Sequence, residues 1–152
     1  MVLPFVRDLF ADAEKLPAFL RVVSHLRANT GRISVSGLTF SAKALLISEL
    51  QKAAERPLIV VVRNNEAADE FVPVIQAYCE LVGGAHADSV VSMPARDVLP
   101  FQNLSPHPEI QEQRAIALWK IATGEASIVV VPAAASGLRL KSADYYANLA
   151  RT

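Results

Sequence analysis

Apolar residues follow two alternating patterns along the chain. Short continuous apolar runs are typical of strands that are buried in a parallel sheet. Between them, apolar residues recur every three or four positions, as on one face of a helix. The expected strands are residues 33–36, 58–62, 89–93 and 127–131, and the expected helices are residues 17–28, 41–55, 65–82, 109–123 and 141–152.

Glycine and proline residues mark the ends of these elements. Gly83-Gly84 and Gly124 are expected to end two of the helices, and Pro73 predicts a kink or a late start inside residues 65–82. Residues 1–14 are expected to form a short helix or an arm, whereas residues 133–140 have no clear pattern. The alternation of strands and helices predicts an α/β fold, with a parallel sheet, helices on both faces and right-handed crossovers. A sheet of four strands is small, so one edge can remain uncovered.

The turn between the first expected strand and its helix is similar to a phosphate-binding loop. Such a loop follows G-x-x-x-x-G-K-[ST], where backbone N–H groups cradle a phosphate and the lysine contacts it. Gly37 and Lys43 stand at the required spacing, with Ser41 between them. However, Ala42 replaces the second glycine, and Ala44 replaces the final hydroxyl residue. The pattern therefore predicts the frame of a phosphate site without two of its chemical parts.

The missing parts are those that a nucleotide hydrolase needs. The Cβ of Ala42 crowds the loop, Phe40 adds a bulky ring, and Ala44 has no oxygen to hold Mg²⁺. None of the other expected strands ends in an acidic residue; Arg63, Pro94 and Pro132 follow or end them. We therefore predict no catalytic residue, no bound cofactor and no metal site in this chain. The alternatives are a chance strand-turn-helix, or a nucleotide- or phosphate-binding protein that retains some binding through Lys43.

Composition limits the other classes of function. The 152 residues suit one domain, and 52% hydrophobic residues argue against disorder. Equal numbers of basic and acidic residues, 15 each, argue against a dedicated DNA-binding surface but not against a local basic patch. The single cysteine, Cys79, excludes an intramolecular disulfide and is expected to be buried. We see no signal peptide and no apolar run of spanning length, and we expect a cytoplasmic protein.

A proline-rich segment, residues 94–108, is the longest expected loop. A loop of this length in a compact domain is often functional. Leu99 and Phe101 either anchor an unknown partner or pack over the hydrophobic core, and both interpretations stay open. His86 and His107 lie in expected loops without neighbouring ligands at metal-binding spacing, so no metal site is inferred.

Three stretches together resemble the bacterial transcription-repair coupling factor family (Mfd). Residues 36–44 resemble a degenerate motif near the N-terminus of that family, and residues 56–62 resemble its second strand. Residues 93–110, with Arg114, resemble its P-x-x-D-x-L-P-[YF]…S-P-H…I…R segment. The resemblance covers roughly residues 16–140.

The resemblance implies a fold and a role. The family's module is similar to the first domain of the excision-repair protein UvrB, so a P-loop NTPase-like domain with a degenerate phosphate loop is expected at residues 15–140. Residues 1–14 would precede it as an arm, and residues 141–152 would start a following segment that is truncated here.

In the family, a separate motor uses ATP and Mg²⁺ to translocate on duplex DNA and displace stalled RNA polymerase. This chain would be a non-catalytic scaffold of the module that recruits UvrA. The UvrA-contacting surface belongs mainly to a domain that follows residues 131–140, so no UvrA-binding residue is assigned.

Overall fold

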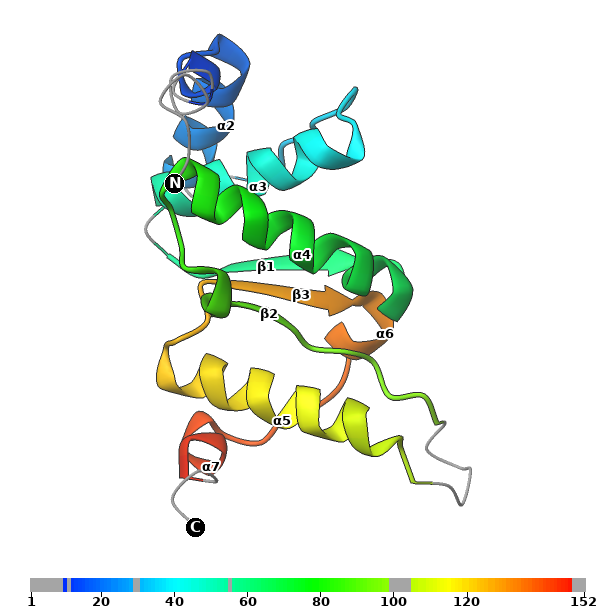
Figure 1. Cartoon of the computed structure of the whole chain (residues 1–152). Coiled ribbons are helices and arrows are strands. Elements are labelled where there is room, and N and C mark those ends of the chain that lie inside the picture. Colours follow the sequence, from blue (N-terminus) through cyan, green and yellow to red (C-terminus); the bar gives the residue numbers. More distant parts are fainter. Residues whose placement is uncertain (1–9, 11, 29–30, 55, 99–104, 149–152) are drawn as a thin grey trace. The chain divides into compact units, whose positions relative to one another are not determined.

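The computed structural model describes residues 10, 12–28, 31–54, 56–98 and 105–148 (Figure 1). These residues form two compact units. The first unit lies within residues 1–56 and 74–87, and the second lies within residues 57–73 and 88–152. No helix in the described part of the chain combines the length and apolar character that crossing a membrane would need.

The second unit is built on a parallel sheet of three strands. The strands are β1 (Leu58–Val62), β2 (Val90–Ser92) and β3 (Ile128–Pro132), in the order β1-β3-β2. Ile128 of the central strand pairs with Leu58 on one side and with Val90 on the other. The helices whose residues all lie in this unit are α5 (Pro108–Thr123), α6 (Ala133–Ser136) and α7 (Ala143–Asn148).

The core of the second unit lies between the sheet and α5. Every residue of β3 is buried, as expected for the central strand of a parallel sheet. Helix α5 ends where the sequence predicted, because Gly124 adopts φ +78° and its N–H group bonds to the Ile121 carbonyl. The buried apolar cluster comprises Val91, Met93, Ala117, Leu118, Ala126, Val129, Val131 and Ala135.

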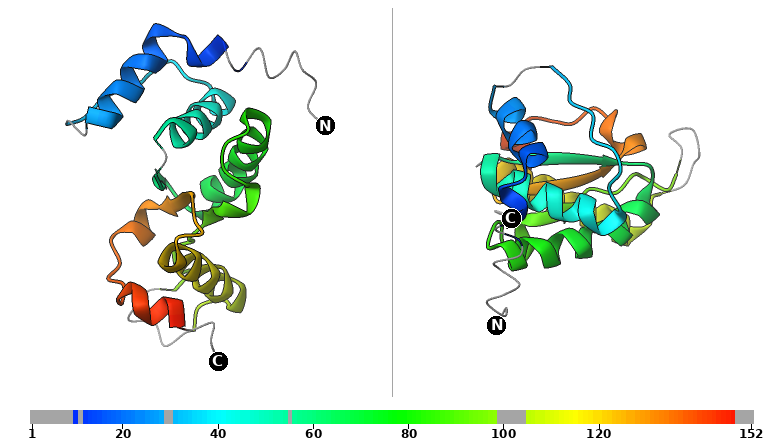
Figure 2. Two further views of the ribbon diagram at one scale, coloured as in Figure 1. Left: turned by 90° about the vertical axis from the view of Figure 1, so that its left-hand side faces the viewer. Right: turned by 90° about the horizontal axis from the view of Figure 1, so that it is seen from above.

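The first unit is helical. Helix α2 (Pro17–Ala28) contacts α3 (Phe40–Ala54), as Figure 2 shows, and the second half of α4 (Asn65–Val82) completes the unit. A short 3₁₀ helix, η1 (Ala87–Ser89), follows α4 in the chain. The Ser48 hydroxyl donates to the carbonyls of Ala44 and Ile75, at 3.0 and 3.4 Å, so a buried polar contact ties α3 to α4. Cys79 is buried in the same place, as the sequence predicted.

The four long helices agree with the expected ranges to within one or two residues. Helix α2 has the expected bounds, α3 begins one residue early, and α4 is continuous through Pro73. The inward face of α3 was predicted wrongly. The apolar pattern of residues 41–55 predicts an inward face made of Leu45, Leu46, Leu50, Ala53 and Ala54, but these residues are only partly buried. The buried residues are Ala44, Ser48 and Glu49. Because the buried face is made of small and polar residues, the apolar pattern pointed to the neighbouring face.

The expected first strand, residues 33–36, is absent. This segment is irregular, and its apolar side chains Ile33 and Val35 are 45% and 46% exposed. Strand-forming residues become a strand only when another strand accepts their hydrogen bonds. Residues 33–36 have no such partner among the described residues, so the sheet has three strands rather than four.

The expectation that residues 58–62 are covered on both faces was also wrong. Strand β1 lies at an edge of the sheet, and Ile59 and Val61 are 73% and 57% exposed. The register places them beside Val129 and Val131, which belong to the buried cluster under α5. This face of the sheet is therefore buried at β3 but exposed to solvent at β1.

Candidate functional site

The similarity to a phosphate loop places the first candidate site at the start of α3. Gly37 has φ +79°, a conformation that side chains with a Cβ rarely adopt. The helix begins at Phe40, and Thr39 caps it, because its hydroxyl accepts the Ala42 N–H at 3.3 Å and its carbonyl accepts the Lys43 N–H at 3.0 Å. Two backbone N–H groups in the first turn of α3 therefore donate to Thr39. A phosphate loop would offer N–H groups of this kind to its ligand instead.

The position of the missing hydroxyl lies inside the helical core. Ala44 is completely buried, and its carbonyl accepts the Ser48 hydroxyl. The side chains of Ser41 and Lys43 are exposed on the same turn. The structure thus brings Gly37, Ser41 and Lys43 to one end of α3, whereas Ala44, at the metal-binding position, is buried.

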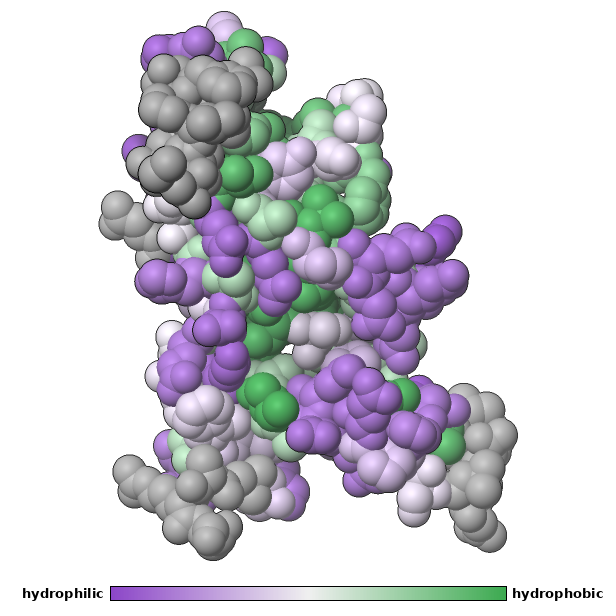
Figure 3. Space-filling view, viewed as in Figure 1, coloured by the Kyte–Doolittle hydropathy of each residue, from purple (hydrophilic) through white to green (hydrophobic). Residues whose placement is uncertain are grey.

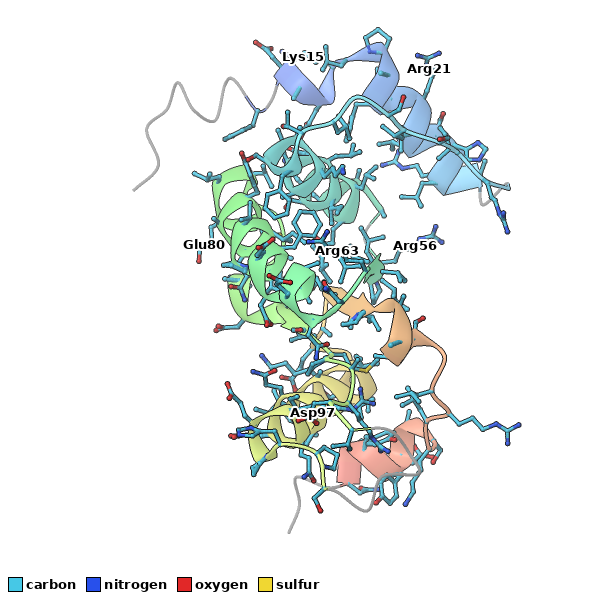
Figure 4. The ribbon with its side chains drawn as sticks, turned by 90° about the vertical axis from the view of Figure 1, so that its right-hand side faces the viewer. Lys15, Arg21, Arg56, Arg63, Glu80 and Asp97 are labelled. Carbon is cyan, nitrogen blue, oxygen red and sulfur yellow. The ribbon has the colours of Figure 1, made fainter. Side chains whose placement is uncertain are left out.

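Asp97 has a structural role at the base of the proline-rich loop. Both of its carboxylate oxygens accept the backbone N–H of His107, each at 3.2 Å. This contact joins the first part of the proline-rich segment to the residue that precedes α5, and Figure 4 shows Asp97 beside that helix. Leu99 and Phe101 fall outside the described residues. Across the described ranges, no three His, Cys, Asp or Glu side chains form a group that could hold a metal ion.

Asn65 and Arg114 hold the segment that leaves β2. The Asn65 amide donates to the Ala95 carbonyl at 3.1 Å and accepts the Ala95 N–H at 2.8 Å, while the Arg114 guanidinium donates to the Pro94 carbonyl. The sequence predicts that the Asn64-Asn65 pair caps the next helix, and Asn64 does cap α4 by accepting the Ala67 N–H. The second contact of the pair was not predicted, because Asn65 is distant in sequence from the segment that it holds.

A buried carboxyl group lies in the first unit, and sequence reasoning did not single it out. Glu49 is 3% exposed, and neither carboxyl oxygen has a protein hydrogen-bond donor among the described residues. The pKa of Glu49 is raised to about 7, mainly by burial and also by the neighbouring Glu14, while Lys52 partly opposes the rise. The Lys52 ammonium lies 2.7 Å from Glu14, whose pKa is lowered mainly by that contact. Only the packing of α3 against the segment that precedes α2 reveals this cluster.

Curated proteins similar to this chain include three transcription-repair-coupling factors from different organisms. That of Myxococcus xanthus is 31% identical over 106 residues, which is 70% of this chain and 9% of the relative. That of Bacillus subtilis is 24% identical over 117 residues, or 77% of this chain and 9% of the relative. That of Staphylococcus epidermidis (strain ATCC 12228 / FDA PCI 1200) is 27% identical over 100 residues, or 66% of this chain and 8% of the relative.

No family model matches the chain, and no solved structure matches it. The matched region spans 8–9% of the length of these relatives. The three agree in name and cover most of the described sequence, in agreement with the resemblance of residues 36–44, 56–62 and 93–110. The chain therefore belongs to the transcription-repair-coupling factor family.

Proposed function

We propose that this chain is the N-terminal UvrB-like module of a transcription-repair-coupling factor and acts there as a non-catalytic scaffold. The observation that carries the proposal is the start of α3. Thr39 caps the turn that would cradle a phosphate, and Ala44 is buried where Mg²⁺ would need a hydroxyl. A loop with these substitutions lacks the groups for hydrolysis. The fold that we propose, on the family resemblance, is that of a P-loop NTPase-like domain with a degenerate loop.

The partners follow from the proposed place in the parent protein. The module would help to recruit UvrA through the domain that follows it, while other domains of the parent would engage RNA polymerase and duplex DNA. ATP and Mg²⁺ would act in the separate motor, and the protein would work in the cytoplasm. The small parallel sheet and its helices would serve as the rigid support for the domain that follows.

Binding to UvrA tests this proposal. A segment of the parent factor that includes the following domain is immobilised, and UvrA binding is measured with and without ATP. We expect binding that ATP does not change and that Lys43→Ala leaves intact, because Lys43 would have no ligand to hold. Failure of this longer segment to bind UvrA, or loss of binding in Lys43→Ala, would contradict the scaffold role.

The alternative function is binding of a nucleotide or phosphate by the loop remnant. The exposure of Lys43 at the positive end of α3 favours it, because helix N-termini attract anions. Calorimetric titration of the chain with ATP, with and without Mg²⁺, separates the two functions. The scaffold role predicts no binding at about 1 mM ATP. Binding that strengthens with Mg²⁺ and disappears in Lys43→Ala would establish the alternative.

A further inference from the structure

A basic cavity lies in the second unit, apart from the loop remnant. Its volume is about 480 Å³, and it is lined by α5, by α7, by the segment between α6 and α7, and by Arg96 and Pro106 of the proline-rich segment. Such a volume is typical of sites for small organic ligands. Among the lining residues are four cations and two tyrosines, and none is acidic: Arg96, Arg114, Arg139, Lys141, Tyr145 and Tyr146 carry the argument.

Among the described residues, none of the four cations of this cavity forms an ion pair with a carboxylate. The ion pairs of the described residues join Lys15 to Asp12 and Lys52 to Glu14, and neither lies in the second unit. On the side of α5 that Figure 3 displays, hydrophilic residues gather over the half nearer Pro108. The acidic residues of that half, Glu109 and Glu112, are exposed and do not line the cavity. The cavity is therefore a local site of unbalanced positive charge in a chain whose net charge is zero.

Arg114 is the buried part of the site. It is only 7% exposed, and its guanidinium donates to the Pro94 carbonyl, which leaves further N–H donors for a ligand. Burial lowers the pKa of Arg114, and repulsion from Arg96 lowers it further, while Tyr146 acts in the opposite direction. Two guanidinium groups close enough to repel each other favour an anion between or beside them.

The opposite wall is held in place by the tyrosines. The Lys141 ammonium lies 3.8 Å from the centre of the Tyr145 ring, and the Lys141 N–H donates to the Tyr146 hydroxyl at 3.2 Å. The two rings meet edge to face, with centres 5.2 Å apart. Helix α7 also packs on α5, which carries Arg114. Part of the wall is therefore organised before any ligand arrives, which reduces the entropy cost of binding.

We propose that this cavity binds a compact organic phosphate with at least two negative charges and a small aromatic or apolar body. Guanidinium groups match phosphate oxygens through paired hydrogen bonds, and a dianion balances more of the four cations than one carboxylate does. The partly exposed Tyr145 ring and the exposed, apolar Leu140 side chain offer surface for the organic body. This site is separate from the loop remnant and does not depend on the scaffold proposal.

Calorimetric titration with three probes tests the ligand class. The probes are phenyl phosphate, inorganic phosphate and benzoate, each added at pH 8, low salt and without Mg²⁺. We expect saturable binding of phenyl phosphate, with benzoate and inorganic phosphate each bound at least about tenfold more weakly. Benzoate carries one negative charge rather than two, and inorganic phosphate lacks the ring. Equal binding of benzoate, or no binding of phenyl phosphate up to about 10 mM, would overturn the proposal.

Substitutions then locate the bound probe. Arg139→Gln removes an exposed cation of the cavity and is expected to weaken phenyl phosphate binding at least about tenfold. The matched control is Arg63→Gln, since Arg63 is exposed after β1 and does not line the cavity (Figure 4). Circular dichroism checks that both variants fold. If Arg139→Gln binds like the wild type, or if Lys43→Gln abolishes binding, the phosphate lies elsewhere and the proposal is wrong.

A final probe distinguishes the site from a peptide-binding surface. A short peptide of four glutamates carries more charge than phenyl phosphate but no phosphate group. If the peptide binds more tightly, and Arg139→Gln weakens its binding, the cavity is a docking site for acidic segments and the phosphate proposal fails. Tighter binding of phenyl phosphate supports the proposal.

Discussion

Glu49→Gln is expected to change how the stability of this chain depends on pH. Glu49 is 3% exposed on α3, and the groups that face it are Glu14 and Lys52. Its pKa in the folded chain is about 7, above its ordinary value of 4.5. The folded state therefore holds this proton more tightly than the unfolded state does.

The sign of the effect follows from this raised pKa. The contribution of Glu49 to stability is complete below about pH 4.5 and is lost as the pH rises through about 7. Glu14, with a lowered pKa, acts in the opposite direction, and its contribution is lost as the pH falls below the ordinary carboxyl range. Between pH 5 and pH 8, the proton on Glu49 therefore dominates this cluster.

The size of the effect follows from the same values. The interval from 4.5 to about 7, at about 1.36 kcal/mol per pKa unit, corresponds to an upper value of about 3 kcal/mol. Because pH 5 already lies above the ordinary value of 4.5, part of this contribution is lost before the measured range, and we expect the free energy of unfolding to fall by about 1 to 3 kcal/mol from pH 5 to pH 8. The amide of Glu49→Gln does not titrate, so this variant loses that part of the slope and is more stable than the wild type at pH 8.

Urea unfolding followed by circular dichroism measures this slope at pH 5, 6, 7 and 8. The matched control is Glu80→Gln, because Glu80 is exposed on α4 and points away from the helix (Figure 4). The control should keep the slope of the wild type. Equal slopes for the wild type and Glu49→Gln, or a wild type that gains stability up to pH 8, would refute the reasoning.

Three further changes test the packing. Ile75→Ala removes a fully buried side chain and should lower the free energy of unfolding by about 2–5 kcal/mol in urea; a loss below about 1 kcal/mol would contradict the assigned core. Asn65→Ala removes both hydrogen bonds to Ala95 and should cost about 1–3 kcal/mol in the same assay, whereas Asn65→Asp should retain the contact to the Ala95 N–H. Cys79 is buried and its pKa is raised by burial, so a thiol reagent should label it only after unfolding; fast labelling of the native chain would contradict this.

The sequence by itself determined the local elements that carry their own start and stop signals. Pro17 begins α2, and Gly124 ends α5 in the left-handed conformation that glycine allows. The apolar runs at β1, β2 and β3 were also recognised, because β-branched residues in short runs favour strands. The family resemblance needed no more than the order and spacing of three segments.

Only the tertiary structure decided features that depend on distant partners. Residues 33–36 have the composition of a strand but lack a neighbouring strand to bond with among the described residues. Glu49 looks like a surface residue of a helix until packing removes it from water and places it beside Glu14. The basic cavity likewise gathers Arg96, Arg114 and Arg139 from three separate segments. These features depend on hydrogen-bond pairing, burial and unbalanced charge, which arise only when distant residues come together in space. Helix caps and apolar periodicity depend on residues that are neighbours in the sequence.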